Sequence, residues 1–460
     1  MKLTIYFPLL STLRRWRRQE RWTREQLQER QTEALRRLRE YAYAHSPFYR
    51  RFHRGLEGRP LHELPVLTKA TMMENFDGLV TDRAIHLTDV ESHLTTLSGN
   101  ERFLGRYWVN GTSGSTGRRG LFLFNHSEWV TVLASFIRAY EWLEGPSSLP
   151  PRKSIVAIVS PTPWHMSRRA GVTLETRWAP AYRLFASDPL ETMVLRLNVW
   201  QPQILGAYPS IARMLANEQL AGRLSIAPKY VFTGAEVLTV DTRRHIEAAW
   251  GEGRVFDVYG ATEGGVIAAE CVHHSGLHLF EDQVIFEVVD QDNRPVPPGK
   301  YGEKLLITVL FNRTQPLIRY ELSDSVRLSD RQCSCGRTFA LITNVQGRME
   351  DILRFPAAAG GEVVINPVIF DQIMDRVPAG EWQVVQETDG VRILLSGTPE
   401  SFSDERLEDD LRRALMAEGV LVPPIRVHRV PAIPRSVTGK APLIKSNLPH
   451  KSPAPDALSS

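Results

Sequence analysis

A short loop rich in glycine and hydroxyl residues constrains this chain more than any other feature. The loop reads Gly111-Thr112-Ser113-Gly114-Ser115-Thr116-Gly117-Arg118, and strand-like apolar runs flank it at 103–109 and 121–124. Glycines let a backbone approach a ligand closely and hydroxyls add donors without bulk, so such a loop can enclose a polyphosphate. It is not a Walker loop, because no Gly-Lys-Ser/Thr follows. It is not a nucleophile elbow either, because Ser115 stands where a glycine is required. On its own it could be an ordinary surface turn.

Composition restricts the class of protein. A chain of 460 residues is too long for one core, and its net charge of +4 does not predict nucleic-acid binding. Three cysteines are too few for a disulfide framework, and no apolar run has the length of a membrane span. Residues 1–13 are apolar, but the arginines follow this stretch, so it does not resemble a signal peptide. We therefore expect a cytoplasmic protein without a transmembrane segment, which could form a homodimer.

The hydrophobic pattern predicts an α/β fold with two domains. Buried strand-like runs at 154–159, 204–207 and 230–233 alternate with helical patterns, which is typical of a layered α/β domain. The runs at 284–289 and 304–309 alternate like antiparallel strands, and a small α+β module follows residue 350. We assign residues 1–55 to a helical lead, 56–347 to the large domain, 348–351 to a boundary, 352–447 to the small domain and 448–460 to a disordered tail.

The helical lead carries a basic face. Its arginines precede leucines at helical spacing, and the helix should end at Ser46-Pro47, because the residue before proline avoids the α region. This face could contact acidic lipid, but a solvated face is the favoured interpretation. The arginines are Arg14, Arg15, Arg17, Arg18 and Arg21.

Four further motifs follow the loop along the chain. An aromatic residue, a hydroxyl and a carboxylate at a strand end suit a purine and Mg²⁺, and a carboxylate after a strand can hold ribose hydroxyls. The first pattern is Asp257-Val258-Tyr259-Gly260-Ala261-Thr262-Glu263, and the second ends in Asp324. The third is Gly347-Arg348-Met349-Glu350-Asp351, and the last is Pro434-Arg435-Ser436-Val437-Thr438-Gly439-Lys440.

Taken together and in this order, the five motifs resemble those of the adenylate-forming superfamily of acyl-CoA synthetases, adenylation domains and luciferases. The phenylacetate–CoA ligase-like branch is the most similar, and residues 38–50 also resemble the first helix of that branch. The resemblance covers residues 30–445. It implies that the small domain is a mobile lid that turns about a hinge at residues 348–351.

The resemblance also implies roles for individual residues. ATP and Mg²⁺ would be the first ligands, and coenzyme A the acceptor of the acyl group. Thr112, Ser113, Gly114, Ser115, Thr116 and Gly117 would hold the phosphates, and Gly234, Ala235 and Glu236 would line the adenine and acyl pockets. Tyr259 and Gly260 would contact adenine, Thr262 would contact phosphate, and Glu263 would bind Mg²⁺. Asp324 would hold the ribose, with Arg348 nearby. Lys440 would complete the adenylation site.

The implied activity is conversion of a carboxylic acid to acyl-AMP and then to an acyl-CoA thioester. Aryl or aryl-acetic acids are the favoured substrates. Mg²⁺ and a lysine ammonium would offset the repulsion between carboxylate and triphosphate. The chain departs from the family at Arg118, at 321–323 and at 355–361, which leaves the acceptor open. AMP transfer to an alcohol, amide formation and a non-catalytic nucleotide-binding relative are the alternatives.

The cysteines form a separate pattern. Cys333 and Cys335 lie on one tight turn, and Cys271 precedes His273, His274 and His278. Three thiolates and one imidazole would make a closed tetrahedral zinc site with a structural role. We select His278 because it begins a strand-like run, although the sequence alone leaves the three histidines open. The competing interpretation is three ordinary reduced thiols.

Overall fold

The computed structural model of the chain describes residues 3–112, 119–144, 155–175, 181–348, 353–358, 360–365, 368–374, 377–436 and 440–448. The chain separates into two compact units. The first contains Met1–Met349 with Arg435–Lys440, and the second contains Glu350–Pro434 and Ala441–Ser460. Within the described ranges, no helix combines the length and apolar character needed to cross a bilayer.

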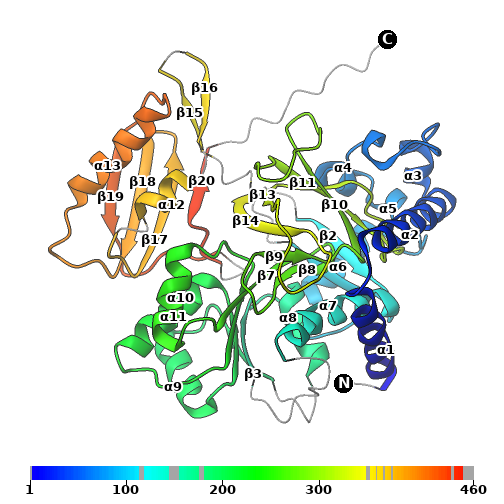
Figure 1. Ribbon diagram of the computed structural model, residues 1–460, viewed down its shortest axis with the longest axis horizontal. Coiled ribbons are helices and arrows are strands. Elements are labelled where there is room, and N and C mark those ends of the chain that lie inside the picture. The colour runs from blue at the N-terminus through cyan, green and yellow to red at the C-terminus, as the bar shows by residue number, and fades with distance from the viewer. Residues whose placement is uncertain are drawn as a thin grey trace. The chain divides into compact units, whose positions relative to one another are not determined.

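A nine-stranded mixed sheet is the framework of the first unit (Figure 1). Its strand order is β13-β14-β9-β8-β7-β6-β5-β3-β4. The last five strands in this order are parallel to one another, whereas the first four are antiparallel to their neighbours. The strands are β3 (Ile155–Val159), β4 (Ala181–Phe185), β5 (Ile204–Ala207), β6 (Tyr230–Gly234), β7 (Val255–Ala261), β8 (Gly265–Glu270), β9 (Leu277–Leu279), β13 (Asp324–Leu328) and β14 (Leu341–Arg348).

Helices cover both faces of the parallel strands, as parallel sheets require. One core joins β3, β5, β6 and β7 to α9, α10 and α11, and another contains residues of α7 and α8. Figure 1 shows the green helices α9–α11 and the cyan helices α7 and α8 on opposite sides of these strands. The helices are α7 (His126–Glu144), α8 (Met166–Leu174), α9 (Leu190–Trp200), α10 (Pro209–Leu220) and α11 (Val240–Trp250).

Smaller sheets complete the first unit. Strands β10 (Val284–Val289), β11 (Lys304–Val309) and β12 (Tyr320–Leu322) pair antiparallel, as the alternating pattern predicted for the first two. Strands β1 (Trp108–Gly111) and β2 (Leu121–Phe124) form a hairpin that brackets the glycine-rich loop.

The predicted strand at 103–109 begins too early. Phe103 and Tyr107 instead close a tight turn, in which the Phe103 amide donates to the Tyr107 carbonyl over 2.9 Å. Leu104 lies inside this turn with a left-handed φ of 50°. Apolar residues of this turn face the core, so the hydrophobic pattern alone resembled a strand.

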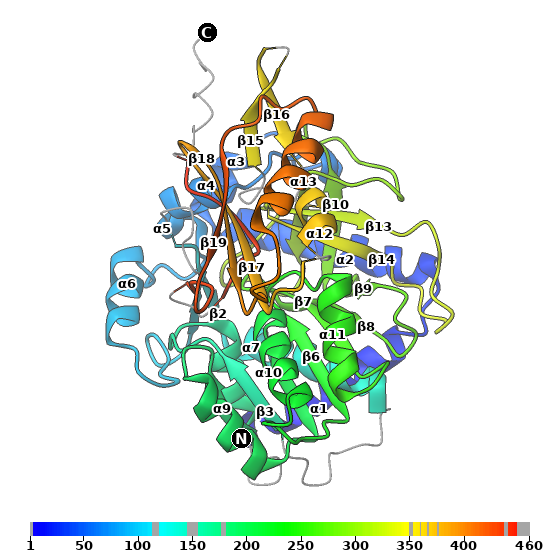
Figure 2. The same ribbon diagram turned by 90° about the vertical axis from the view of Figure 1, so that its left-hand side faces the viewer.

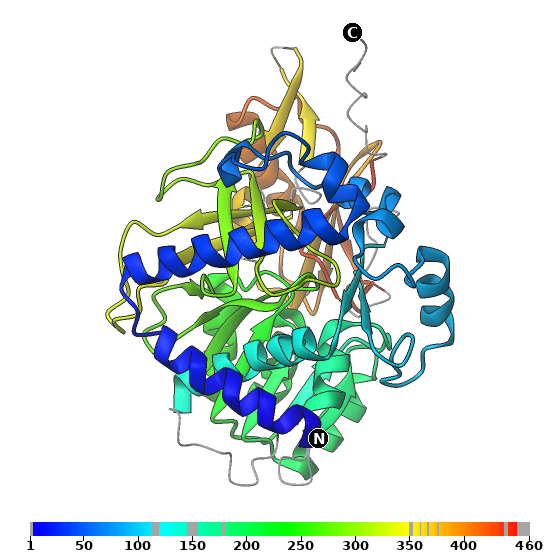
Figure 3. The same ribbon diagram turned by 90° about the vertical axis from the view of Figure 1, so that its right-hand side faces the viewer.

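The N-terminal helices lie over one face of the first unit (Figure 3). Helix α2 (Arg24–His45) begins with a capping box, in which the Thr23 and Gln26 side chains each accept a hydrogen bond from the other residue's backbone amide. It ends at His45, with Ser46 as its C-cap, as the proline predicted. The elements are α1 (Leu3–Gln19), α2 (Arg24–His45), α3 (Pro47–Phe52), the 3₁₀ turn η1 (Leu61–Glu63), α4 (Lys69–Glu74), α5 (Phe76–Leu79) and α6 (Leu87–Thr96).

The second unit is a small α+β module. Its four-stranded sheet has the order β19-β18-β17-β20, and a separate hairpin pairs β15 with β16. Leu407, Leu411 and Leu415 recur every fourth residue and place one face of α13 in the core. Figure 2 shows α12 and α13 on the same side of this sheet. The elements are β15 (Leu353–Pro356), β16 (Glu362–Ile365), α12 (Val368–Met374), β17 (Glu381–Glu387), β18 (Gly390–Ser396), α13 (Asp404–Ala417), β19 (Ile425–Arg429) and β20 (Ile444–Ser446).

The fold class predicted from the sequence, a large N-terminal layered α/β part followed by a small α+β part, is confirmed. The predicted tail at 448–460 lies outside the described residues except for Leu448, and so do Glu350 and Asp351 of the predicted hinge.

Candidate active site

The carboxyl ends of the parallel strands gather the residues predicted around adenine and the acyl group. Ala207 of β5 pairs with Thr233 of β6, and Gly234 pairs with Val258 of β7. The residues at and just beyond the carboxyl ends of these strands therefore lie at one edge of the sheet, which is where α/β sheets bind ligands. These residues are Tyr208, Gly234, Ala235, Glu236, Tyr259 and Gly260.

Hydrogen bonds connect the segments that leave these strands. The Ser210 amide donates to Glu236 Oε2 over 3.1 Å, which joins the start of α10 to the end of β6. Burial raises the pKa of Tyr208, and the negative charge of Glu236 raises it further, so the phenol stays neutral. Tyr208 and Glu236 thus lie close enough to interact.

The local backbone explains why Gly234 and Ala235 stand where they do. A side chain at Gly234 would place its Cβ 2.7 Å from the carbonyl oxygen of Val258, so only glycine lets β6 lie this close to β7. Ala235 then adopts a left-handed φ of 68°, which turns the chain out of the sheet. A small residue is needed at such a position, because a bulky side chain is strained there.

Tyr259 and Asp324 meet although 65 residues separate them. The Tyr259 hydroxyl donates to Asp324 Oδ2. Asp324 begins β13, and its register partner on β14 is Arg348, of which the structure describes the backbone. The structure therefore brings the predicted adenine-stacking residue and the predicted ribose carboxylate together, with the Arg348 backbone beside them.

The turn between β7 and β8 holds Thr262 and Glu263. Glu263 is buried, with 5% of its surface exposed, and Thr262 is half-buried. The turn is fixed to α7, because Ser135 Oγ accepts from the Val266 amide over 3.0 Å. A Cβ at Gly265 would lie 2.8 Å from the same Oγ, so glycine is required for this contact. The Glu263 carboxylate is therefore held by a rigid support.

The base of the phosphate loop is closed by Thr112. The Thr112 amide donates to the Gly120 carbonyl, and the Gly120 amide donates to Thr112 Oγ1, both over 2.9 Å. The predicted phosphate contacts Ser113, Gly114, Ser115, Thr116 and Gly117 lie outside the described residues.

Lys440 is the last residue of the segment Arg435–Lys440, which belongs to the first unit. The Ser436 amide donates to the Lys440 carbonyl over 2.8 Å, and the Lys440 amide donates to Ser436 Oγ over 3.1 Å. Arg435 Nη1 donates to Ser210 Oγ over 3.0 Å, on the same α10 start that bonds Glu236.

His165 lies near the carboxyl ends of the parallel strands and belongs to none of the sequence motifs. It follows β3, and its Nδ1 lies 2.9 Å from Ser167 Oγ. Burial, together with the positive charge of Lys440, lowers the pKa of His165 to about 3, so its imidazole is neutral. His165 is the N-cap of α8 and lies six residues beyond the end of β3, so the sequence carried no local signal for it.

The four residues predicted to bind zinc also come together. Their ligand atoms all lie within 4.8 Å of one another. Cys271 Sγ is 3.7 Å from Cys333 Sγ, and Cys335 Sγ is 3.4 Å from His278 Nε2. Burial lowers the pKa of His278 to about 4, so the ring presents a neutral nitrogen. Burial raises the pKa of the Cys271 thiol to about 12.

The other two histidines near Cys271 have different partners. His273 Nδ1 lies 3.1 Å from Ser334 Oγ, and His274 Nδ1 lies 3.5 Å from Glu270 Oε2. His278 is thus the histidine that the fold brings to the three thiols.

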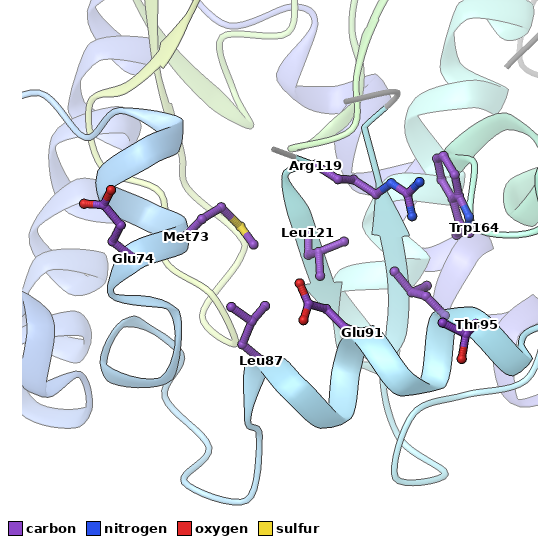
Figure 4. A pocket seen from close by; sticks show the side chains of 9 residues that line it. Met73, Glu74, Leu87, Glu91, Thr95, Arg119, Leu121 and Trp164 are labelled. Carbon is purple, nitrogen blue, oxygen red and sulfur yellow. The ribbon is translucent and has the colours of Figure 1, made fainter. Parts of the chain in front are cut away.

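A cavity of about 780 Å³ lies beside the base of the phosphate loop (Figure 4). In the figure the Arg119 guanidinium lies next to the Trp164 ring, and its carbon is 4.0 Å from the ring centroid. Among the described residues, those predicted at the nucleotide do not line this cavity. Its walls are Met73, Glu74, Leu87, Glu91, Leu94, Thr95, Arg119, Leu121 and Trp164.

Comparison with known proteins supports the resemblance that the motifs indicated. The family described as AMP-binding enzyme matches residues 107–308. Phenylacetate-coenzyme A ligase of Thermus thermophilus is 28% identical over 387 residues, covering 76% of this chain and 74% of that protein. The Escherichia coli protein of the same name is 26% identical over 348 residues, covering 72% of each. This chain is therefore similar to AMP-binding enzymes over residues 107–308 and to two phenylacetate-coenzyme A ligases over most of its length.

A solved structure shows the same fold as this chain. 2-Hydroxyisobutyryl-CoA ligase in the postadenylation state superimposes with a TM-score of 0.70 at 20% identity, over 90% of this chain and 88% of that one. The match at 107–308 includes the phosphate loop, the strand ends and Glu263, whereas Asp324, Cys333 and Lys440 lie beyond it. The assignment of these three residues therefore depends on their positions in the structure.

Proposed function

We propose that this adenylate-forming chain joins a carboxylic acid to coenzyme A in two steps. In the first, a carboxylate oxygen attacks the α-phosphorus of ATP, the bond to the bridging oxygen breaks, and acyl-AMP and pyrophosphate result. In the second, the thiol sulfur attacks the acyl carbonyl, AMP leaves, and the thiol proton passes to solvent. The observation that carries the proposal is the assembly of Tyr208, Glu236, Tyr259 and Glu263 at one edge of the sheet, with Asp324 bonded to Tyr259.

The proposed roles follow from side-chain chemistry. Tyr259 offers a flat face to adenine while its hydroxyl orients Asp324, whose remaining oxygen can accept from a ribose hydroxyl. The Arg348 side chain would add a cation nearby, since its backbone pairs with Asp324. Thr112 and the loop 113–117 would donate to the phosphates, and Gly234, Ala235 and Gly260 leave room for the nucleotide.

Two groups would cancel charge during adenylation. Mg²⁺ prefers carboxylate and hydroxyl oxygens, and Glu263 with Thr262 supplies that donor set at one buried turn. When bound, the ion offsets negative charge on the phosphates. Lys440 would donate to the oxygens of the reacting phosphate, where a positioned cation stabilises the transition state more than the bound substrates.

The acid is proposed to be aryl or aryl-acetic. Two relatives are named phenylacetate-coenzyme A ligase. Tyr208 follows β5 and Phe232 lies within β6, so both would supply aromatic surface, and Ala235 would leave space beyond β6. An apolar pocket with few polar groups suits a flat ring that carries one carboxylate.

A pyrophosphate-release assay over a panel of carboxylic acids, with and without coenzyme A, tests the proposal. We expect acid-dependent pyrophosphate, with aryl acids ahead of short aliphatic acids, and thioester only when coenzyme A is present. Pyrophosphate without thioester would favour another acceptor, such as an alcohol or an amine. No pyrophosphate with any acid would indicate a nucleotide-binding protein without catalysis.

The proposal also covers a second metal, the location of the protein and its domain boundaries. We propose Zn²⁺ as a second, structural metal at Cys271, His278, Cys333 and Cys335. A cytoplasmic location fits three cysteines that form no disulfide. The expected domain boundaries, including a hinge at 348–351, and a homodimer stay predictions.

A further inference from the structure

The four-residue thiol and imidazole cluster has the dimensions of a tetrahedral zinc site. Zinc bonds of about 2.3 Å to sulfur and about 2.0–2.1 Å to nitrogen give tetrahedral edges of about 3.8 Å between two sulfurs and about 3.6 Å between sulfur and nitrogen. The corresponding distances are 3.7 Å for Cys271–Cys333 and 3.4 Å for Cys335–His278. A disulfide would require sulfurs about 2.05 Å apart.

The cluster joins three elements that are distant in the sequence. Cys271 follows β8, His278 lies on β9, and Cys333 with Cys335 lies on the connection between β13 and β14. Cys271, His278 and Cys333 are buried, and Cys335 is half-buried. Four protein ligands complete a tetrahedron without water, which is typical of structural zinc and not of catalytic zinc.

The connection that carries two of the cysteines also contacts the junction of α1 and α2. We call residues 333–340 the cysteine turn. Arg337 Nε donates to Glu20 Oε2 over 3.3 Å, and Thr338 Oγ1 donates to the Trp22 carbonyl over 3.0 Å. The Ala340 amide donates to Glu281 Oε2 over 2.6 Å.

A second set of contacts runs from the ligand His278 to the same junction. The Trp142 ring packs edge-on to the His278 ring, with centroids 5.5 Å apart. Trp142 Nε1 donates to Glu20 Oε1 over 2.8 Å. Glu281 also accepts from Arg24 Nη1 over 2.7 Å, and Leu27 belongs to the same apolar cluster as Cys271 and Cys333.

We infer that a metal at this cluster fixes the cysteine turn and thereby anchors the junction of the two N-terminal helices, residues 20–27, to the antiparallel half of the sheet. The turn itself has little regular structure, so cross-linking its two thiolates to β8 and β9 is what holds its Arg337 and Thr338 in reach of α1 and α2. The inference rests on the zinc assignment proposed above and is independent of the ligase chemistry.

Metal analysis combined with hydrogen–deuterium exchange on the full-length protein tests the inference. We expect about one zinc per chain. The variant Cys335→Ser should lose the zinc and should exchange faster in peptides that cover residues 3–45. Peptides of α9 and α10 should be unchanged, since these helices pack in a separate core. The matched control Ser334→Ala lies on the same turn but offers no ligand, and it should keep both zinc and protection.

A second variant separates the metal from the contacts it supports. Arg337→Met should retain zinc and still loosen the 20–27 junction, so the inference stays testable if Cys335→Ser does not fold. Purified protein without zinc, or with another metal in its place, would overturn the metal assignment. Zinc-free Cys335→Ser with unchanged exchange at 3–45 would overturn the anchoring role alone. Pyrophosphate release measured in parallel reports on the ligase proposal separately.

Discussion

The two halves of the nine-stranded sheet use the same kind of framework for different purposes. In the parallel half, polar residues stand just beyond the strand ends, where they are open to a ligand and are supported by backbone contacts such as that of Gly234 with Val258. In the antiparallel half, polar residues are buried and paired with one another, as at Arg138 and Asp282. We therefore expect changes at the strand ends of the first half to alter chemistry and changes at the buried ion pairs beside the second to alter stability. Asp324, which begins β13 and bonds Tyr259, belongs with the site.

The largest expected effect is on stability, at Arg138. Its guanidinium is 1% exposed, and it donates to Asp282 over 2.8 Å and to Glu20 over 3.0 Å. Arg138→Met removes the cation that pairs with the buried Asp282 carboxylate and one of the two cations beside Glu20, so we expect a loss of about 3–5 kcal/mol in the free energy of unfolding. Denaturant titration measures it. The double variant Arg138→Met/Asp282→Asn should recover part of the loss, and a normal midpoint in the single variant would contradict the contrast between the halves.

The next effect is on chemistry, at Lys440. If its ammonium stabilises the adenylation transition state, Lys440→Ala should slow acyl-AMP formation about 10²–10³-fold, or about 2.7–4 kcal/mol. Thioester formation from preformed acyl-AMP and the melting temperature should remain normal. Lys445→Ala, on β20, is the matched control and should be neutral. Equal losses in both half-reactions would show that Lys440 does not act on adenylation alone.

A smaller effect is expected for metal binding at Glu263. Glu263→Gln keeps the size of the side chain and removes its charge, so the Mg²⁺ concentration for half-maximal pyrophosphate release should rise. A charged contact is worth about 1.5–3 kcal/mol, which corresponds to about 10- to 100-fold. Glu252→Gln, exposed after α11, should not change the Mg²⁺ dependence. An unshifted curve for the Glu263 variant would remove this residue from the metal site.

A last prediction concerns pH and tests β7, the strand where the two halves meet. Burial, with the nearby charge of Glu270, raises the pKa of Asp257 from 3.8 to about 8. The folded state therefore favours the protonated acid, whose stabilising contribution is complete below pH 3.8 and is lost as the pH rises to about 8. Melting temperatures at pH 5, 6.5 and 8.5 should fall with rising pH, and they should fall less in Asp257→Asn. Parallel profiles for both proteins would contradict this account.

Much of the candidate site was visible in the sequence because its signals are local. The phosphate loop, the stretch from Asp257 to Glu263 and the pair Cys333 and Cys335 each lie within a few residues, and each stands beside an apolar strand pattern. Local patterns also mislead: Phe103 and Tyr107 belong to a turn whose apolar residues face the core, so the run resembled a strand. His165 was missed because a single histidine after a strand carries no motif.

The sequence by itself determined the class of fold, the strand ends that bear polar residues and the presence of three thiols near histidines, because spacing and hydrophobic period express them over short distances. Only the tertiary structure decided that Tyr259 bonds Asp324, that His278 and not His273 faces the thiols, and that Arg138 joins Glu20 to Asp282. Each of these contacts joins segments that are far apart along the chain. They depend on strand order and on the reversal of direction after β7, which no local pattern specifies.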